Sequence, residues 1–123
     1  MVKQLTFILL ITGFFSYSIL LYTKGTNDTT QISSIEKVEM LKGKQLYQKY
    51  NCTACHQLYG LGGYLGPELT TTYSNKERGE TAIRTFLKNG GPRMPNFNLT
   101  NDEINQLVVF LKYVDASAIS YKK

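Results

Sequence analysis

The sequence predicts an all-α protein in which an N-terminal transmembrane helix precedes a single small helical domain. Three observations lead to this prediction. Residues 4–23 carry no charge and are rich in Leu, Ile and Phe, and about 20 such residues are enough to cross a bilayer as a helix. Three later segments combine a capping-box sequence with the helical spacing of apolar residues. No alternating pattern of strand length occurs in the 123 residues.

The uncharged segment has two competing interpretations, a retained membrane anchor and a cleaved signal peptide. Ser16-Tyr17-Ser18 has the small-residue spacing of a cleavage site. The apolar run continues past that site to Tyr22, however, and so reaches the length of a membrane span. We therefore expect an uncleaved transmembrane anchor over residues 1–25.

A polar stretch follows the anchor and predicts a short tether over residues 26–35. The folded domain is then expected over residues 36–118. Its first helix is predicted at about residues 36–50, behind the capping box Ser33-x-x-Glu36. Four residues share one face of this helix: Gly43, Leu46, Tyr47 and Tyr50. Because Gly43 has no side chain, it would let another helix approach closely.

Two further helices are predicted in the second half of the domain. Ser74-x-x-Glu77 would open a helix over about residues 76–88, which Asn89-Gly90-Gly91 would end. Thr100-x-x-Glu103 would open a helix over residues 101–114. The side chains expected to point inward are Ile83, Phe86 and Leu87 in the first helix, and Ile104, Leu107, Val108 and Leu111 in the second.

The charge of the chain argues against a nucleic-acid partner. The formal net charge is +5, but from Thr26 onward twelve basic side chains face nine acidic ones. The charges of the soluble part are mild and interleaved, which is typical of a solvated surface rather than of a nucleic-acid interface.

The residues that carry chemistry gather in Cys52-Thr53-Ala54-Cys55-His56. They include both cysteines and the single histidine of the chain. Cys-x-x-Cys-His is the attachment motif of a c-type haem. The two thiols would form thioethers with the vinyl groups, and the adjacent His56 would be the proximal axial ligand of the iron.

Three other interpretations of the cysteine pair fit the sequence less well. A structural zinc ion needs four ligands, and no second Cys/His cluster exists in the sequence. A thiol–disulfide exchange motif is expected beside a βαβ pattern, which does not surround this one. A structural disulfide between Cys52 and Cys55 is the third alternative. The sequence therefore predicts one covalent haem c.

The stretch after His56 is rich in glycine and proline and predicts a loop over residues 57–66. Glycines let a backbone lie close against a flat ligand. A carbonyl at Pro67, or just before it, is a candidate partner for the second ring nitrogen of His56. Such a bond would orient the imidazole and raise its donor strength.

The best candidate for the second axial ligand is Met94. A six-coordinate electron-transfer haem pairs its histidine with Met or with a second His, and the chain has no second His. Met1 belongs to the end of the anchor, and Met40 lies on a helix before the attachment motif. Met94 lies in an irregular stretch between two prolines, 38 residues beyond His56.

The order of these features resembles that of class I cytochromes c over about residues 38–116. That order is a helix, Cys-x-x-Cys-His, Gly66-Pro67-Glu68-Leu69, a helix, Met94-Pro95 and a final helix. The segments 55–69 and 94–99 further resemble the cytochrome c subunit of bacterial nitric oxide reductase. The single N-terminal anchor fits the same family.

The resemblance implies a function and a location. In that family the cytochrome c subunit is not the catalyst. It passes electrons from an outside donor to a polytopic membrane subunit that reduces nitric oxide. The resemblance also implies a calcium ion at the subunit junction, bound through Gly62 and Tyr64. Because cytochromes c mature outside the cytoplasmic membrane, the haem domain is expected on the periplasmic or outer face. The local charges around the anchor also favour a cytoplasmic N-terminus.

The sequence departs from this family in two places. Leu61 stands where an acidic residue is common, and the stretch before Met94 is shorter. A related terminal oxidase therefore stays open as the partner. A free-standing anchored cytochrome that shuttles electrons in a respiratory chain is the other alternative. A peroxidase-like enzyme would need an open iron position and a distal acid–base group, so we do not favour it.

Overall fold

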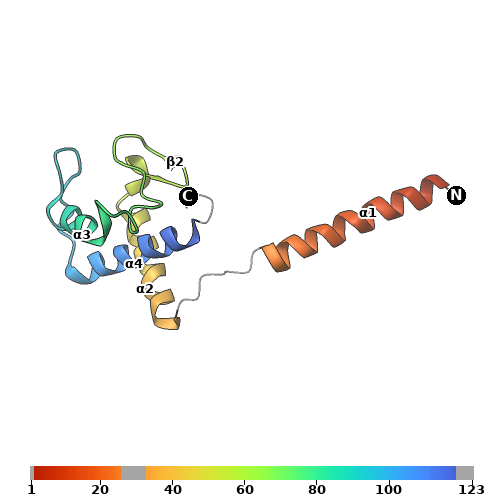
Figure 1. Ribbon diagram of the computed structural model, residues 1–123, viewed down its shortest axis with the longest axis horizontal. Helices are drawn as coiled ribbons and strands as arrows, with labels where there is room; N and C mark the ends of the chain where they lie inside the picture. The colour runs from red at the N-terminus through yellow and green to blue at the C-terminus, as the bar shows by residue number, and fades with distance from the viewer. Residues whose placement is uncertain (1, 26–32, 119–123) are drawn as a thin grey trace.

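The computed structural model describes residues 2–25 and 33–118, and its regular elements are mostly helical (Figure 1). The predicted all-α class, with an N-terminal helix of membrane-spanning length, is confirmed. In chain order the elements are α1 (Val2–Leu20), the π-helical turn η1 (Leu21–Gly25), α2 (Ser34–Lys49), the 3-10 turn η2 (Cys52–Ala54), β1 (Gln57–Leu58), β2 (Leu61–Gly62), α3 (Gly79–Asn89) and α4 (Asn101–Ser117).

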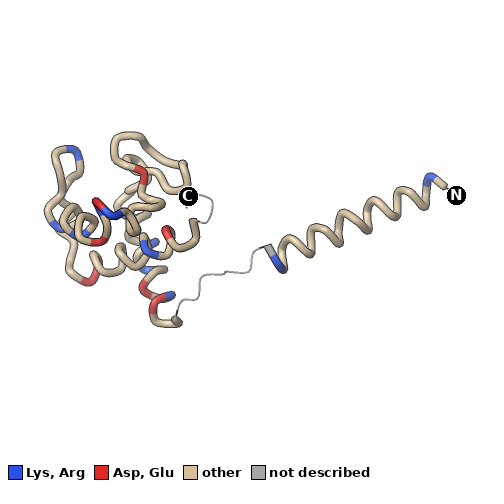
Figure 2. The backbone as a smooth tube through the Cα atoms, in the orientation of Figure 1, with Lys and Arg blue, Asp and Glu red and all other residues tan. Residues whose placement is uncertain are grey.

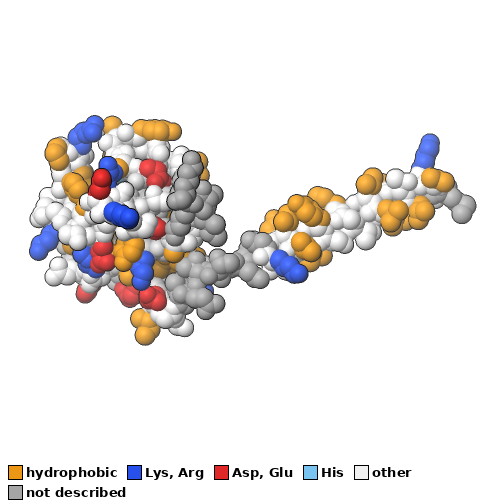
Figure 3. All heavy atoms as spheres, viewed as in Figure 1, with side chains coloured by type: hydrophobic (Ala, Val, Ile, Leu, Met, Phe, Trp, Pro, Cys, Tyr) orange, Lys and Arg blue, Asp and Glu red, His pale blue; other side chains and the backbone are white. Residues whose placement is uncertain are grey.

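Helix α1 and the turn after it form an apolar helical stretch (Figure 3). Val2–Lys24 is 23 residues long, an 18-residue window within it has a mean hydropathy of 1.9, and no residue of α1 is buried. Its charges, Lys3 and Lys24, lie near its two ends (Figure 2). This stretch is long and apolar enough to cross a membrane. Most of the predicted tether, residues 26–32, lies outside the described residues.

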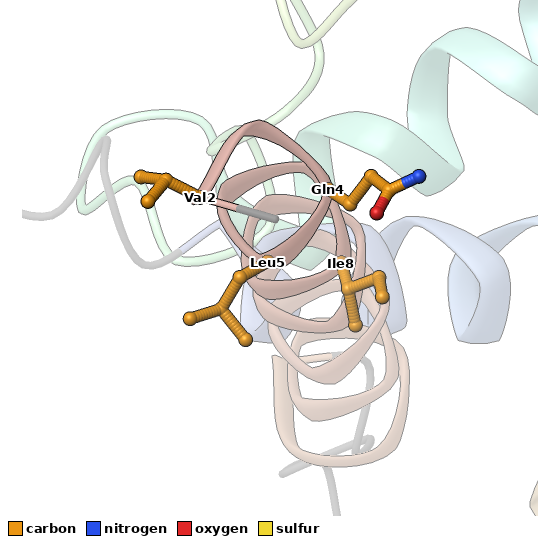
Figure 4. A pocket seen from close by; sticks show the side chains of 4 residues that line it. All are labelled: Val2, Gln4, Leu5 and Ile8. Atoms are coloured by element: carbon orange, nitrogen blue, oxygen red, sulfur yellow. The ribbon is translucent and has the colours of Figure 1, made fainter.

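A hollow on α1 is lined by Val2, Gln4, Leu5 and Ile8. All four side chains come from the first turns of one helix and point away from its axis (Figure 4). Because nothing in the fold encloses this hollow, we assign no ligand to it.

The core of the domain is the contact between α2 and α4. Gly43 of α2 permits this contact, because a Cβ atom there would collide with the backbone carbonyl of Gln106. One turn later Tyr47 packs against Phe110, with 5.4 Å between the ring centroids. The close approach predicted at Gly43 is therefore confirmed. The buried core comprises Met40, Tyr47, Ile83, Ile104, Leu107, Val108, Phe110, Leu111 and Val114.

Two of the three predicted capping boxes are present. The Ser33 hydroxyl accepts the backbone N–H of Glu36, and the Glu36 carboxylate accepts the backbone N–H of Ser33. Thr100 and Glu103 form the same pair of bonds at the start of α4. Each box satisfies two backbone donors that would otherwise lack partners.

The predicted start of α3 is wrong by three residues. Ser74 and Glu77 form no capping box. Instead the Asn75 side chain accepts the backbone N–H groups of Glu77 and Arg78, and α3 begins at Gly79.

The predicted inward position of Phe86 is also wrong: its side chain is 51% exposed, and its ring lies against Gly91. The predicted end is confirmed, because the backbone N–H of Gly90 caps α3 on the carbonyl of Phe86.

The glycine-rich stretch contains a short hairpin that the sequence pattern did not predict. β1 and β2 pair antiparallel through Gln57–Gly62 and Leu58–Leu61. The two turn residues, Tyr59 and Gly60, both have positive φ, as a tight two-residue hairpin turn requires. The buried Thr70 supports this turn by accepting the backbone N–H of Tyr59 at 2.6 Å.

Helix α4 extends three residues beyond its predicted end, to Ser117. Residues of this added turn form hydrogen bonds with two segments outside α4. The buried carboxylate of Asp115 accepts the backbone N–H of Ser74 at 2.8 Å. The Ser117 hydroxyl lies 2.7 Å from the hydroxyl of Tyr59. These bonds hold the hairpin and the segment before α3 against the end of α4.

Candidate functional site

The attachment motif lies in a compact backbone turn directly after α2. Asn51 takes a left-handed conformation (φ 51°) and reverses the chain between α2 and η2. The backbone N–H groups of Cys55 and His56 both donate to the carbonyl of Cys52, at 3.2 and 2.9 Å. The five residues from Cys52 to His56 therefore form one short helical turn, which places both cysteines and the histidine close together.

The two cysteines form no disulfide and are partly buried. Burial raises the pKa of the Cys52 thiol. The nucleophilic cysteine of a disulfide-exchange motif has a lowered pKa instead. The described residues also contain no group of three or more His, Cys, Asp and Glu side chains placed to hold a metal ion. Neither a redox dithiol nor a zinc site is favoured.

The histidine is held by the predicted backbone carbonyl. The Nδ1 atom of His56 lies 2.8 Å from the carbonyl oxygen of Pro67. A carbonyl only accepts, so Nδ1 carries the proton and Nε2 is the nitrogen with a free lone pair. A Cβ atom at Gly66 would collide with the imidazole ring. The chain thus fixes both the tautomer and the position of the ring, as metal-ligating histidines require.

The glycines of the loop lie flat against the attachment turn. The backbone N–H groups of Gly63 and Gly66 donate to the carbonyls of Thr53 and Cys55, at 2.8 and 2.7 Å. A Cβ atom at Gly62 would collide with the carbonyl oxygen of His56, and Gly62 also has a φ of +134°. Close packing against the turn from Cys52 to His56 is therefore sufficient to explain why Gly62 is glycine.

Tyr64 lies two residues after Gly62 and is 86% exposed. Its neighbours Leu61 and Leu65 are also largely exposed, at 76% and 61%. The predicted calcium residues are therefore on one exposed loop. Among the described residues this chain supplies no carboxylate cluster beside them.

Met94 ends a tight turn rather than lying on a helix. The backbone groups of Gly91 and Met94 bond reciprocally, at 2.8 Å from the N–H of Gly91 and 3.2 Å from that of Met94. Pro92 and Arg93 form the tip of this turn, and the Met94 side chain is partly exposed. No hydrogen bond between described residues joins this turn to the attachment turn.

One aromatic contact joins the segment before the attachment turn to the segment after the Met94 turn. The sequence did not predict this contact. Tyr50 lies two residues before Cys52, and Phe97 three residues after Met94. Their ring centroids are 5.1 Å apart. The Tyr50 hydroxyl also points to the Glu103 carboxylate, at 3.5 Å. Because it depends on contacts between distant segments, this arrangement has no local sequence signal.

The buried hydroxyl of Tyr47 has no hydrogen-bond partner among the described residues. Its side chain is 4% exposed, and burial, together with the charges of Cys52 and Glu68, raises its pKa. An unpaired buried hydroxyl costs about 1–3 kcal/mol. This orphan group beside Cys52 fits a site whose remaining polar partners come from a bound group. Together with two free thiols and an oriented imidazole, it fits a covalent haem.

Comparison with known proteins points the same way. The sequence profile of the family described as "Cytochrome C oxidase, cbb3-type, subunit III" matches residues 38–111 of this chain. The match begins in α2 and ends in α4, so it contains all of the attachment turn, the loop and the Met94 turn.

Several curated relatives are named as one and the same subunit of nitric oxide reductase. The protein from Stutzerimonas stutzeri is 28% identical over 102 residues, covering 75% of this chain and 66% of the relative. The one from Paracoccus denitrificans is 28% identical over 101 residues, covering 72% and 64%. The one from Halomonas halodenitrificans is 26% identical over 88 residues, covering 62% and 59%. The chain thus spans about two thirds or less of the length of these relatives.

Proposed function

The chain belongs to the family of the cytochrome c oxidase, cbb3-type, subunit III, and from this premise we propose that it feeds electrons to the catalytic subunit of a membrane nitric oxide reductase. Membership implies an electron-transfer cytochrome c domain with a covalently bound haem c. The observation that carries the cofactor assignment is the oriented His56 beside two free thiols. The partner is inferred from the name that the relatives share.

We assign the cofactor to four residues. Cys52 and Cys55 would form the thioether bonds, and Nε2 of His56 and the thioether sulfur of Met94 would be the axial ligands. The bound haem supplies a one-electron redox couple. The chain itself contributes orientation. Pro67 holds the imidazole through its carbonyl, and the backbone of the Gly91–Met94 turn holds the methionine outside any helix.

We propose the domain organisation and topology from the same observations. Residues 1–25 would be a retained single-pass anchor in the cytoplasmic membrane, 26–35 a tether, and 36–118 the monohaem domain. The domain would lie on the periplasmic or outer face, because haem is attached to cytochromes c outside the cytoplasm. Helix α1, apolar and without a buried residue, supports the anchor.

A terminal oxidase is the second candidate partner, because the matching family is described by a subunit of a cbb3-type oxidase. In both cases this chain delivers electrons and the partner performs the catalysis. The electron donor would be a soluble or membrane protein on the same side of the membrane.

The decisive experiment is purification of the native protein in mild detergent. We expect a polytopic subunit to co-purify in a fixed ratio, with a reduced c-type spectrum and nitric oxide consumption by the preparation. Oxygen consumption without nitric oxide consumption would identify an oxidase instead. A c-type cytochrome that purifies alone, with no polytopic band, would contradict both partner assignments and favour a free-standing shuttle.

We also propose that the exposed loop around Tyr64 forms part of the partner interface, with Gly62 and Tyr64 near a shared calcium ion. Gly62 would contribute through its carbonyl and Tyr64 through its hydroxyl. In the co-expressed complex, Tyr64→Phe should leave haem content and potential nearly unchanged, because Tyr64 is 86% exposed. Turnover or subunit association should fall severalfold, and chelation of calcium should add little further loss.

Exposed Tyr17, in α1, provides the matched control. Tyr17→Phe removes the same hydroxyl far along the chain from the loop and should leave turnover and chelator sensitivity as in the wild type. A Tyr64→Phe complex that assembles, turns over and responds to chelation like the wild type would remove Tyr64 from the interface.

A further inference from the structure

Helix α2 has an exposed apolar surface that the fold of the domain does not use. Its buried side is formed by Met40, Gly43 and Tyr47. On the other side Ile35, Val38 and Leu41 are 78%, 51% and 46% exposed. Val38 and Leu41 follow the 100° step of a helix and lie nearly opposite Gly43. Because these three aliphatic side chains follow one another at i, i+3 and i+6, they form one continuous apolar stripe, which makes them a candidate interaction surface.

The charges beside this surface that lack an ion-pair partner are basic. Lys37 and Lys44 are two turns apart on one side of the stripe, and neither has an ion pair among the described residues. Both carboxylates of α2 are engaged in ion pairs. Glu39 pairs with Lys42 at 2.9 Å, and Glu36 pairs with Lys112 at 3.6 Å and closes the capping box. We call Ile35, Val38, Leu41, Lys37 and Lys44 the α2 outer face.

The haem would leave this face uncovered. Leu41 precedes Cys52 by eleven residues, which is about 16 Å along a helix, and Ile35 is farther still. Figure 1 shows the first turns of α2 at the edge of the domain, away from the hairpin that follows the attachment turn. The apolar stripe therefore needs an occupant other than the cofactor.

The chain itself limits how far this face can be from a membrane. Seven residues separate Gly25 from Ser33, and even a fully extended chain of that length spans no more than about 30 Å. If α1 crosses the bilayer, the first turn of α2 is tethered within that distance of its surface. An apolar stripe flanked by lysines is the pattern of helices that lie at the interface of anionic bilayers.

We propose that the α2 outer face rests on the bilayer surface, with Ile35, Val38 and Leu41 at the boundary of headgroups and acyl chains and with Lys37 and Lys44 on anionic headgroups. The proposal rests on the retained anchor of the proposed function. It gives the domain a fixed orientation on the membrane, so that the hairpin side of the domain is turned away from the lipid contact and left free for a protein partner.

The test uses the full-length holoprotein in vesicles of phosphatidylcholine and phosphatidylglycerol that contain a nitroxide-labelled lipid. In the holoprotein Cys52 and Cys55 are bonded to haem, so a single introduced cysteine can be labelled with a fluorophore. Gln45→Cys places the probe beside the α2 outer face, and Lys88→Cys places it at the exposed end of α3. Lipid quenching at position 45 should exceed that at position 88 by roughly threefold.

Two sets of variants test the apolar side chains and the lysines of the α2 outer face separately. In the Gln45→Cys background, Ile35→Gln, Val38→Gln and Leu41→Gln together should reduce quenching to the level at position 88. Lys37→Gln with Lys44→Gln should weaken it in vesicles with phosphatidylglycerol and have little effect in pure phosphatidylcholine. Lys76→Gln with Lys88→Gln removes the same charge elsewhere and should change nothing. Because all substituted side chains are exposed, these variants should fold.

Flotation of the vesicles and the intact mass of the chain test the anchor separately. A protein that floats with its N-terminus intact, but shows equal quenching at positions 45 and 88, would overturn the membrane contact and leave the anchor standing. Contact only after the polytopic subunit is added would overturn it in favour of a protein partner. A protein that fails to float would overturn both the anchor and this inference.

Discussion

The double variant Cys52→Ala and Cys55→Ala is expected to lose covalent haem completely. Denaturing gels of the wild type should retain peroxidase-active haem on the protein band, because thioether bonds survive unfolding. The variant should show none, even when it is produced with a full haem-attachment system. Both thiols are free in the structure, and the turn that holds them also holds the oriented His56.

Loss of the cofactor should also lower the stability of the domain. The buried core lies mainly between α2 and α4, and the buried Tyr47 hydroxyl has no partner within the described chain. A domain of this size buries a smaller share of its surface than a larger domain does, so we expect poor accumulation and early proteolysis.

Thr53→Ala is the matched control for this double variant. It changes an exposed side chain within the same turn, and its backbone carbonyl still accepts Gly63. This control should keep its haem. A double variant whose haem stays on the band after denaturation, or a colourless wild type matured with the full attachment system, would contradict the assignment.

The helix boundaries show which features the sequence could predict. Ser33 with Glu36, and Thr100 with Glu103, cap their helices through bonds that span only three residues, so a local pattern was sufficient. Ser74 has the same pattern but not the same structure, since its backbone N–H bonds to Asp115, 41 residues away. Where a distant partner competes for a backbone group, a local motif does not decide the outcome.

The loop after His56 was predictable in outline but not in detail. Two-residue strands are too short to show alternation, and a positive φ at Tyr59 is rare outside glycine. The hairpin depends instead on Thr70, which supports Tyr59 from eleven residues away.

The chemistry of the site was more predictable than its surroundings. The motif and the Pro67 carbonyl are close in sequence to His56, so residue types and spacing were enough to predict the imidazole contact. The Tyr50–Phe97 contact and the unpaired Tyr47 hydroxyl come from packing between distant segments. They could not be found before the helices were placed.

Met94→Ala is expected to leave haem attached but to open the sixth coordination position. The oxidised protein should lose its sulfur-to-iron absorption. The reduction potential should fall by on the order of 100 mV, because an axial thioether raises it and axial ligation spans a range of about 0.8 V. Spectroscopy of the oxidised protein and a potentiometric titration would measure both effects.

Of the two methionines in the domain, Met94 is the one we propose as the distal ligand, and its surroundings support this choice over Met40. Met40 is 8% exposed and belongs to the packed α2–α4 core, so its sulfur is engaged in packing. Met94 is partly exposed in a turn fixed by two backbone bonds with Gly91, and the Tyr50–Phe97 contact ties the segment after it to the end of α2. Met40→Leu conserves volume, costs less than about 1.5 kcal/mol, and should keep both the absorption and the potential. An unchanged spectrum in Met94→Ala, or its loss in Met40→Leu, would rule out Met94 as the distal ligand.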